Sequence, residues 1–347
     1  MTPRSVRSVL LTALALVVTT ALVPGTAAAR QHEESARTPT MRSGDGISVL
    51  STTPIDDRTI DVRISTSLVS DGATIKGNGL RIVLPEGYDP RSPRRYPVLY
   101  LLHGGASSHT TWYDSNAADI VRFAGSDLII VMPDGGKIGM YTDWVDQTTY
   151  RQSWLTFHLT QLIPFVDRNL KTIADRESRA IAGVSMGGGG AFHYAFARPD
   201  LFGVAASFSG VLNPHAPLGV VGIAAVNAYW KMPTFGQYGL PFWPFWEPWR
   251  AANPVAHAAK FRGVTTLLYA GEGTDPVELT MRDFTETMSR ALTKAGVPHT
   301  YVNYGRPGGR CNGGHEIGCG AHAFALAMPE IREALSLPAL DRLGPAS

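Results

Sequence analysis

One serine lies in a sequence pattern that presents a side-chain hydroxyl to a substrate. Residues 183–187 read Gly-Val-Ser-Met-Gly, the G-x-S-x-G pattern centred on Ser185. In this pattern a sharp turn between a strand and a helix raises the serine above the end of the strand. The apolar run SRAIAGV comes before the serine, and small residues followed by an amphipathic helical pattern come after it. We therefore predict that Ser185 is a nucleophile.

A serine hydroxyl is a weak nucleophile at neutral pH and needs a base that takes its proton. Where the G-x-S-x-G turn supplies the serine, an acid and then a histidine follow it along the chain. We predict that the base is His322, in the segment GAHAF at the mouth of a final helix expected over residues 321–335. His315 is the competing candidate. The remaining histidines come before the expected position or, like His32, lie near the N-terminus.

The acid that orients the base is expected after the predicted strand VTTLLYA, where the sequence continues GEGTDPVE. Asp275 occupies the usual loop position. Glu278 would lie on the first turn of the following helix and could also point toward the base. Either carboxylate could instead do no more than stabilise the start of that helix through its dipole, so the chemistry of the residues leaves both candidates open.

Two backbone N–H groups are expected to stabilise the oxyanion that forms when the serine attacks a carbonyl. The residue after the nucleophile, Met186, supplies one of them in this pattern, and the loop after the third strand supplies the other. The segment LLHGGA provides that loop, and Gly105 is the candidate donor. The glycines of this loop would also suit a tight turn without any catalytic role.

From about residue 59 onward, short apolar runs alternate with longer helical patterns. Strands that are apolar on both faces favour a mainly parallel sheet with helices on both sides, and the first runs favour antiparallel pairing at one edge. We predict an α/β-hydrolase fold, with one catalytic domain over residues 58–340 that contains an aromatic-rich, cap-like insert over residues 213–256.

The aromatic side chains of this insert have two interpretations. They could form an apolar wall for an acyl chain or a contact with lipid, or they could pack inward to hold the insert together. The residues concerned are Tyr229, Trp230, Phe235, Tyr238, Phe242, Trp243, Phe245, Trp246 and Trp249.

Residues 1–29 have the pattern of a secretory signal peptide. Two arginines precede an apolar run over residues 9–23, and the segment PGTAAA follows it. The run is shorter than the roughly 20 residues that span a bilayer, so we expect no transmembrane anchor. We predict cleavage after Ala29, which makes the protein secreted, extracellular or cell-wall-associated. We also predict that residues 30–57 form a flexible polar leader.

The two cysteines, Cys311 and Cys319, are expected to form a disulfide in an exported chain, which would stiffen the loop before His322. With His315 and His322 they could alternatively form a compact zinc site, but thiolates oxidise outside the cell, so we expect no metal. The 31 basic residues nearly balance the 29 acidic ones, and the sequence has no block of like charge. We therefore expect no nucleic-acid partner.

Several segments together resemble the antigen 85 type mycolyltransferases, within the wider putative esterase group that includes S-formylglutathione hydrolase. The resemblance runs from about residue 60 to residue 335. The segments that carry it are Tyr141-Thr142-Asp143-Trp144, the elbow GVSMGGGGA, Ser209-Gly210-Val211-Leu212-Asn213-Pro214, Gly271-x-Gly273-Thr274, and the histidine loop Gly320-x-His322.

The resemblance implies roles for particular residues. The family places its acid on a glutamate eighteen residues before a glycine that ends the following helix, and Glu278 stands eighteen residues before Gly296. This favours Glu278 over Asp275. Gly105 and Met186 fall at the two oxyanion positions of the family.

The sequence departs from the family where the substrate would bind. The mycolyltransferases carry D-G-L-R, whose aspartate and arginine hold trehalose, but this chain has His103-Gly104-Gly105-Ala106. The T-H-S-W segment around the family's base is replaced by Ala321-His322-Ala323-Phe324. The resemblance therefore implies acyl-transfer chemistry on an acyl ester or lipid, with water or another alcohol, such as a sugar, as acceptor, rather than mycolate transfer to trehalose.

Together these features predict a secreted serine esterase or acyltransferase that acts through Ser185, His322 and Glu278, forms an acyl-enzyme and needs no cofactor. The alternative is a non-catalytic extracellular binding protein, similar to an adhesin, that keeps the fold. Peptidase activity is a third option, because a fold by itself does not fix the reaction.

Overall fold

The structure is a computed structural model that describes residues 39–115 and 117–339. The predicted signal peptide, the cleavage after Ala29 and the start of the predicted leader lie outside the described residues. None of the helices within the described ranges is both long and apolar enough to cross a lipid bilayer.

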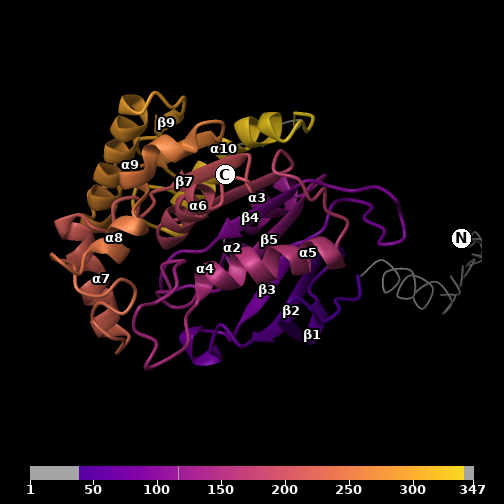
Figure 1. The fold of residues 1–347 in the computed structure, drawn as a ribbon. Helices are drawn as coiled ribbons and strands as arrows, with labels where there is room; N and C mark the ends of the chain where they lie inside the picture. The colour runs from indigo at the N-terminus through magenta and orange to yellow at the C-terminus, as the bar shows by residue number, and fades with distance from the viewer. Residues whose placement is uncertain (1–38, 116, 340–347) are drawn as a thin grey trace, which may run out of the picture. The chain divides into compact units, whose positions relative to one another are not determined.

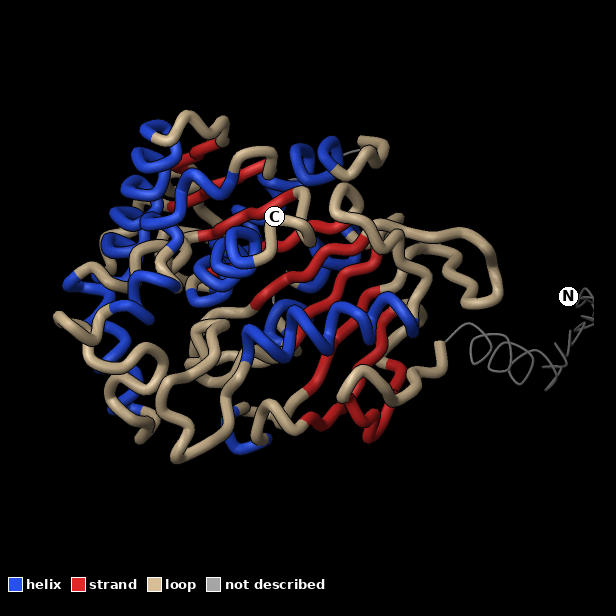
Figure 2. The backbone as a smooth tube through the Cα atoms, in the orientation of Figure 1, coloured by secondary structure: helices blue, strands red, loops and turns tan. Residues whose placement is uncertain are grey.

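A nine-stranded sheet in the order β1-β2-β3-β5-β4-β6-β7-β8-β9 forms the centre of the described chain (Figures 1 and 2). The pairs β1–β2, β2–β3 and β3–β5 are antiparallel, whereas the pairs from β5 across to β9 are parallel. This confirms the predicted mainly parallel sheet with an antiparallel amino-terminal edge. The strands are β1 (Ile47–Pro54), β2 (Thr59–Thr66), β3 (Gly79–Val83), β4 (Val98–Leu102), β5 (Ile129–Pro133), β6 (Arg179–Val184), β7 (Val204–Phe208), β8 (Thr265–Ala270) and β9 (Thr300–Asn303).

Helices cover both faces of the sheet because the central strands are apolar on both sides. In β4, Val98, Tyr100 and Leu102 belong to one apolar core, while Leu99 and Leu101 belong to the other. The first core includes residues of α5 (Ile163–Asn169), α6 (Met186–Ala197) and α9 (Pro276–Lys294), and α5 crosses the strands on this face in Figure 1. The second core includes residues of α2 (Thr111–Asp114), α3 (Ala118–Ala124) and α10 (Ile317–Ala334).

Further helical segments complete the connections between these elements. They are η1 (Asp71–Ala73), α4 (Trp154–Thr156), the π-helical turn η2 (Phe157–Leu162), α7 (Pro217–Tyr229), α8 (Glu247–Ala251) and η3 (Pro254–Phe261).

The predicted flexible leader over residues 30–57 is wrong for its second half. Residues 47–54 form strand β1, which pairs with β2 from end to end with one register shift between Val49 and Ser51. The Met41 side chain is buried, and the backbone N–H of Arg42 donates to the side chain of Asn169. An edge strand needs few apolar residues because its backbone hydrogen bonds hold it in place, and most of the ISVLSTTP side chains are exposed or half-buried. The folded unit therefore begins before residue 58.

The insert over residues 213–256 contains α7, α8 and the loop between them. Trp249 and Tyr238 are buried, whereas Tyr229 and Trp243 are 78% and 75% exposed. Some of the aromatic side chains thus pack inward, and others form an exposed apolar surface. We call the exposed part the insert's apolar surface, and its large side chains are Leu218, Val221, Tyr229, Leu240, Phe242, Trp243, Phe245 and Trp246.

Helix α7 has the reverse of the usual surface-helix pattern. Its sequence PLGVVGIAAVNAY has no charged residue, and its polar residue Asn227 is buried. The Asn227 side-chain amide donates to the backbone oxygens of Pro233 and Thr234 and to Oε1 of Gln237. A helix of a soluble protein normally exposes its polar face. Here the exposed face is apolar.

Candidate active site

Ser185 stands at the turn between β6 and α6, with backbone angles φ 55° and ψ −119°. A positive φ is rare for a residue with a side chain and is tolerated when the surrounding structure enforces it. Gly187 allows α6 to pack directly on the sheet, because a Cβ there would lie 2.5 Å from the carbonyl oxygen of Leu102. The backbone N–H of Ser185 donates to the carbonyl oxygen of Phe208 on β7. The strand, turn and helix expected around Ser185 are all present.

The imidazole next to Ser185 belongs to His315. Its Nε2 lies 2.8 Å from the Ser185 Oγ, and its Nδ1 lies 2.9 Å from Oε2 of Glu278. His315 comes from the loop between β9 and α10, and its side chain is 16% exposed. The three side chains therefore form a continuous hydrogen-bonded chain from carboxylate to hydroxyl, the arrangement in which a histidine can take a proton from a serine.

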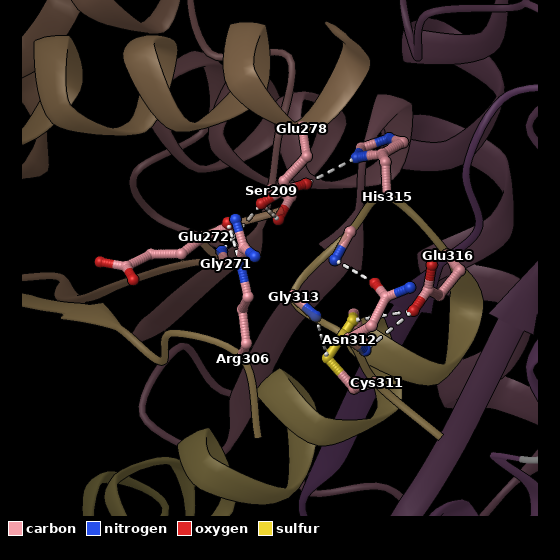
Figure 3. The surroundings of a disulfide bond; sticks show 12 residues. Ser209, Gly271, Glu272, Glu278, Arg306, Cys311, Asn312, Gly313, His315 and Glu316 are labelled. Carbon is pink, nitrogen blue, oxygen red and sulfur yellow. Dashed lines mark hydrogen bonds and ion pairs between the residues drawn. A yellow bond between two sulfur atoms is a disulfide. The ribbon is translucent and has the colours of Figure 1, made fainter. Parts of the chain in front are cut away.

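The Glu278 carboxylate is fully buried on the first turn of α9. Its Oε1 accepts hydrogen bonds from the Ser209 hydroxyl and from the backbone N–H of Gly271, each at 2.8 Å. With His315 on the other oxygen, each carboxylate oxygen has a partner (Figure 3). A buried carboxylate requires such partners, and they hold its position relative to the imidazole.

Asp275 is the other acid candidate. Within the described residues, no hydrogen bond joins its carboxylate to the His315 ring. It is the N-cap of α9, where its Oδ1 accepts from the backbone N–H of Glu278 at 2.9 Å. Its Oδ2 accepts from the backbone N–H of His315 at 3.3 Å. Asp275 thus connects the backbones that carry the carboxylate and the imidazole.

The structure corrects the sequence-based choice of His322. This residue lies within α10, which begins at Ile317, and its ring packs edge-on against Tyr304 with 5.4 Å between ring centroids. Burial lowers the pKa of His322. Since α10 begins four residues earlier than expected, the loop before it ends at Glu316 and carries His315 to the serine. A useful sequence signal for His315 was its position midway between the two cysteines.

Cys311 and Cys319 form a disulfide, as predicted (Figure 3). The disulfide was predicted to close a loop just before the base His322. In the structure the base, His315, lies inside the loop that the disulfide closes. The backbone N–H of Gly313 donates to the Cys311 sulfur inside this short loop. Because both sulfur atoms are used in the bond, they offer no thiolates for the alternative zinc site.

The two predicted oxyanion donors are Met186, which directly follows the serine, and Gly105, in the loop after β4. The backbone N–H of Met186 is at the first position of α6. Gly104 approaches the serine from the loop after β4, and a Cβ on it would lie 3.4 Å from the Ser185 Cβ. In that loop the backbone N–H of Ala106 is already used by the carbonyl oxygen of Lys137, at 2.7 Å. Gly105 therefore remains the candidate for the second donor.

A polar cavity of about 490 Å³ lies beside His315. Charged and amide side chains from the loops after β8 and β9 line it, together with glycines. Its lining residues are Gly273, Thr274, Asp275, Arg306, Gly308, Asn312, His315 and Glu316. The imidazole is thus accessible from a space that suits a polar group.

Comparison with known proteins shows the family of the chain. The family model described as putative esterase matches residues 75–331. The chain is 33% identical over 273 residues to the esterase Rv1288 of Mycobacterium tuberculosis, covering 74% of this chain and 57% of that protein. It is also 31% identical over 197 residues to the diacylglycerol acyltransferase/mycolyltransferase Ag85B of Mycobacterium avium, covering 53% of this chain and 56% of that protein. The chain therefore spans a little over half the length of these relatives.

Solved structures share the fold. The crystal structure of Mycobacterium tuberculosis MPT51 matches with a TM-score of 0.62 and 20% identity, over 77% of this chain and 97% of that one. An S-formylglutathione hydrolase from Agrobacterium tumefaciens matches with a TM-score of 0.59 and 15% identity, over 83% of this chain and 98% of that one. These matches confirm the predicted α/β-hydrolase fold.

Proposed function

Because the chain belongs to the putative esterase family, we propose that it is a serine-dependent ester hydrolase or acyltransferase. The observation that carries this proposal is the hydrogen-bonded series from Glu278 through His315 to Ser185. In the proposed reaction the Ser185 Oγ attacks the ester carbonyl while His315 Nε2 takes its proton. The negative charge on the carbonyl oxygen is stabilised by the N–H groups of Gly105 and Met186.

His315 then gives its proton to the leaving alcohol, and the acyl group remains on Ser185 as an ester. Water, or a second alcohol, donates a proton to His315 and attacks this acyl-enzyme. His315 then returns the proton to the Ser185 Oγ as the acid or the new ester leaves, which restores the serine. Glu278 keeps the imidazole oriented and stabilises its protonated form. The polar cavity that His315 lines supports a polar acceptor near the imidazole.

We further propose that the acyl donor is an apolar ester and that the protein is exported. The names of the relatives include esterase and diacylglycerol acyltransferase, which supports an acyl ester or lipid substrate. The insert's apolar surface supports contact with such a substrate. The disulfide and the signal-peptide pattern support an oxidising, extracellular location.

The proposed function is tested with short- and medium-chain p-nitrophenyl esters, using the wild type and Ser185→Ala. We expect the variant to lose about a million-fold in turnover, since the nucleophile and base of such a site act as a unit. Equal rates for the two proteins would refute the proposal. Labelling by a fluorophosphonate probe separates it from the adhesin alternative, because a non-catalytic binding protein would not react at Ser185.

A further inference from the structure

The side chain of His103 lies at the base of the loop that supplies the candidate donor Gly105. His103 follows β4 directly, and its side chain is only 1% exposed. Its Nδ1 lies 2.7 Å from the carbonyl oxygen of Gly104, and its Nε2 lies 2.8 Å from the backbone nitrogen of Gly135. Both ring nitrogens therefore have a backbone partner.

These two partners fix the tautomer of the ring. A backbone N–H can only donate, so Nε2 must accept from Gly135. The proton of the neutral ring is then on Nδ1, where it is donated to the Gly104 oxygen. Burial is the main cause that lowers the pKa of His103, which keeps the ring neutral and preserves this division of donor and acceptor.

The carbonyl group of Gly104 and the N–H group of Gly105 belong to the same peptide unit. In a trans peptide the two groups point in opposite directions and rotate together. A donor that holds the Gly104 oxygen therefore also sets the direction of the Gly105 N–H. We propose that His103 is a positioning residue for the oxyanion site, acting through its Nδ1–H on the peptide between Gly104 and Gly105.

The rest of the loop is held at its two ends, so this central peptide is the part that His103 controls. The Tyr141 hydroxyl donates to the carbonyl oxygen of His103 at 3.1 Å. The N–H of Ala106 donates to the carbonyl oxygen of Lys137. Glycines at 104 and 105 lack side chains that would restrict rotation of the peptide between them. An ionised aspartate in place of His103 could only accept hydrogen bonds and could not hold a carbonyl oxygen in this way.

The inference rests on the proposed function and is tested by a matched pair of variants. In His103→Asn the side-chain amide is at the distance of Nδ1 and can still donate to the Gly104 oxygen. In His103→Gln the amide is at the distance of Nε2 and can replace only the acceptor for Gly135. We expect kcat for a p-nitrophenyl ester to fall about 10- to 100-fold in the glutamine variant, with KM within about threefold, because removal of a whole oxyanion donor costs about 100- to 1,000-fold. The asparagine variant should recover most of this loss.

The measurement must separate positioning from loss of fold. Each rate is divided by the concentration of sites that a fluorophosphonate probe labels to completion, which removes any unfolded fraction. Affinity for a trifluoromethyl ketone, whose adduct with Ser185 carries the oxyanion, should weaken in the glutamine variant by the same factor as kcat/KM. Wild-type kcat per labelled site in His103→Gln, or equal losses in both variants, would overturn the inference while leaving the proposed function intact. An inactive, unlabelled wild type would instead overturn the proposed function, and this inference with it.

Discussion

Asp275 Oδ2 accepts a hydrogen bond from the backbone N–H of His315, while its other oxygen caps the helix that carries Glu278. One side chain therefore connects two segments that lie far apart in the sequence. The chemistry of the residues left both acids open as candidates, and the family resemblance favoured Glu278. Glu278 contacts the imidazole, and Asp275 holds the backbone on both sides of that contact.

We expect Asp275→Ala to lower stability and activity moderately. Loss of a helix N-cap costs about 0.5 to 2 kcal/mol, and loss of the second hydrogen bond leaves the His315 backbone less well held. The free energy of unfolding from urea titration and kcat for a p-nitrophenyl ester measure the two effects. Asp275→Asn should restore most of the stability, because asparagine is an equally good cap. If Asp275→Ala lost more activity than Glu278→Ala, the assignment of the acid would have to be reversed.

The two candidate bases are separated by alanine substitution. We expect His315→Ala to lose about a million-fold in kcat, because it removes the proton acceptor of Ser185. His322→Ala removes a ring that packs against Tyr304 and should change kcat by less than about tenfold. The pair is a matched comparison, since the two residues are the same type and lie in adjoining segments. A comparable loss in both variants would contradict the role given to His315.

Replacing both cysteines should loosen the loop that holds His315. Closing a loop of this length restricts the unfolded chain by about 2 to 3 kcal/mol. We expect Cys311→Ala/Cys319→Ala to unfold at a lower urea concentration and to have a reduced kcat, with KM changed less. Dithiothreitol should reduce the activity of the wild type and leave the double variant unaffected. Full activity of the double variant would mean that the loop holds His315 without the bond.

Stability should decrease as the pH falls below about 6.5. Burial lowers the pKa of His158 to about 3 and that of His193 to about 4, from 6.5 for an ordinary histidine. Between pH 6.5 and these lower values, the unfolded chain binds protons that the folded chain does not bind, so unfolding becomes more favourable as the pH falls. The melting temperature measured from pH 7 to pH 4 tests this. His193→Phe, which keeps an aromatic ring beside Phe196, should make the dependence less steep, and an unchanged slope would count against this account.

The fold was predictable because its signals are local. Strands that are apolar on both faces and the G-x-S-x-G turn can be recognised within a few residues, and these features indicate the parallel sheet and Ser185. The antiparallel strand β1 was missed because it is an edge strand with mostly polar, exposed side chains. Its place depends on backbone hydrogen bonds to β2, which leave little trace in the sequence.

The base was misplaced for a related reason. The first turn of α10 contains Gly318 and Gly320, and glycine disfavours a helix, so the sequence indicated a later start near residue 321. A helix start near residue 321 places the end of the preceding loop close to His322 instead of His315, and the wrong histidine was chosen for this reason. Which imidazole meets the serine depends on contacts between distant loops, such as Asp275 with the His315 backbone, and these do not follow a local pattern.

Gly187 has no Cβ, and this allows α6 to lie close enough to the sheet for Ser185 to meet His315. Because any Cβ there would collide with the Leu102 carbonyl oxygen, even alanine would force α6 away from the sheet. Ser185 directly precedes that helix, so a shift of α6 would also move its hydroxyl relative to the imidazole. The distance between the Ser185 hydroxyl and the His315 imidazole thus depends on a glycine that has no side chain to take part in the reaction.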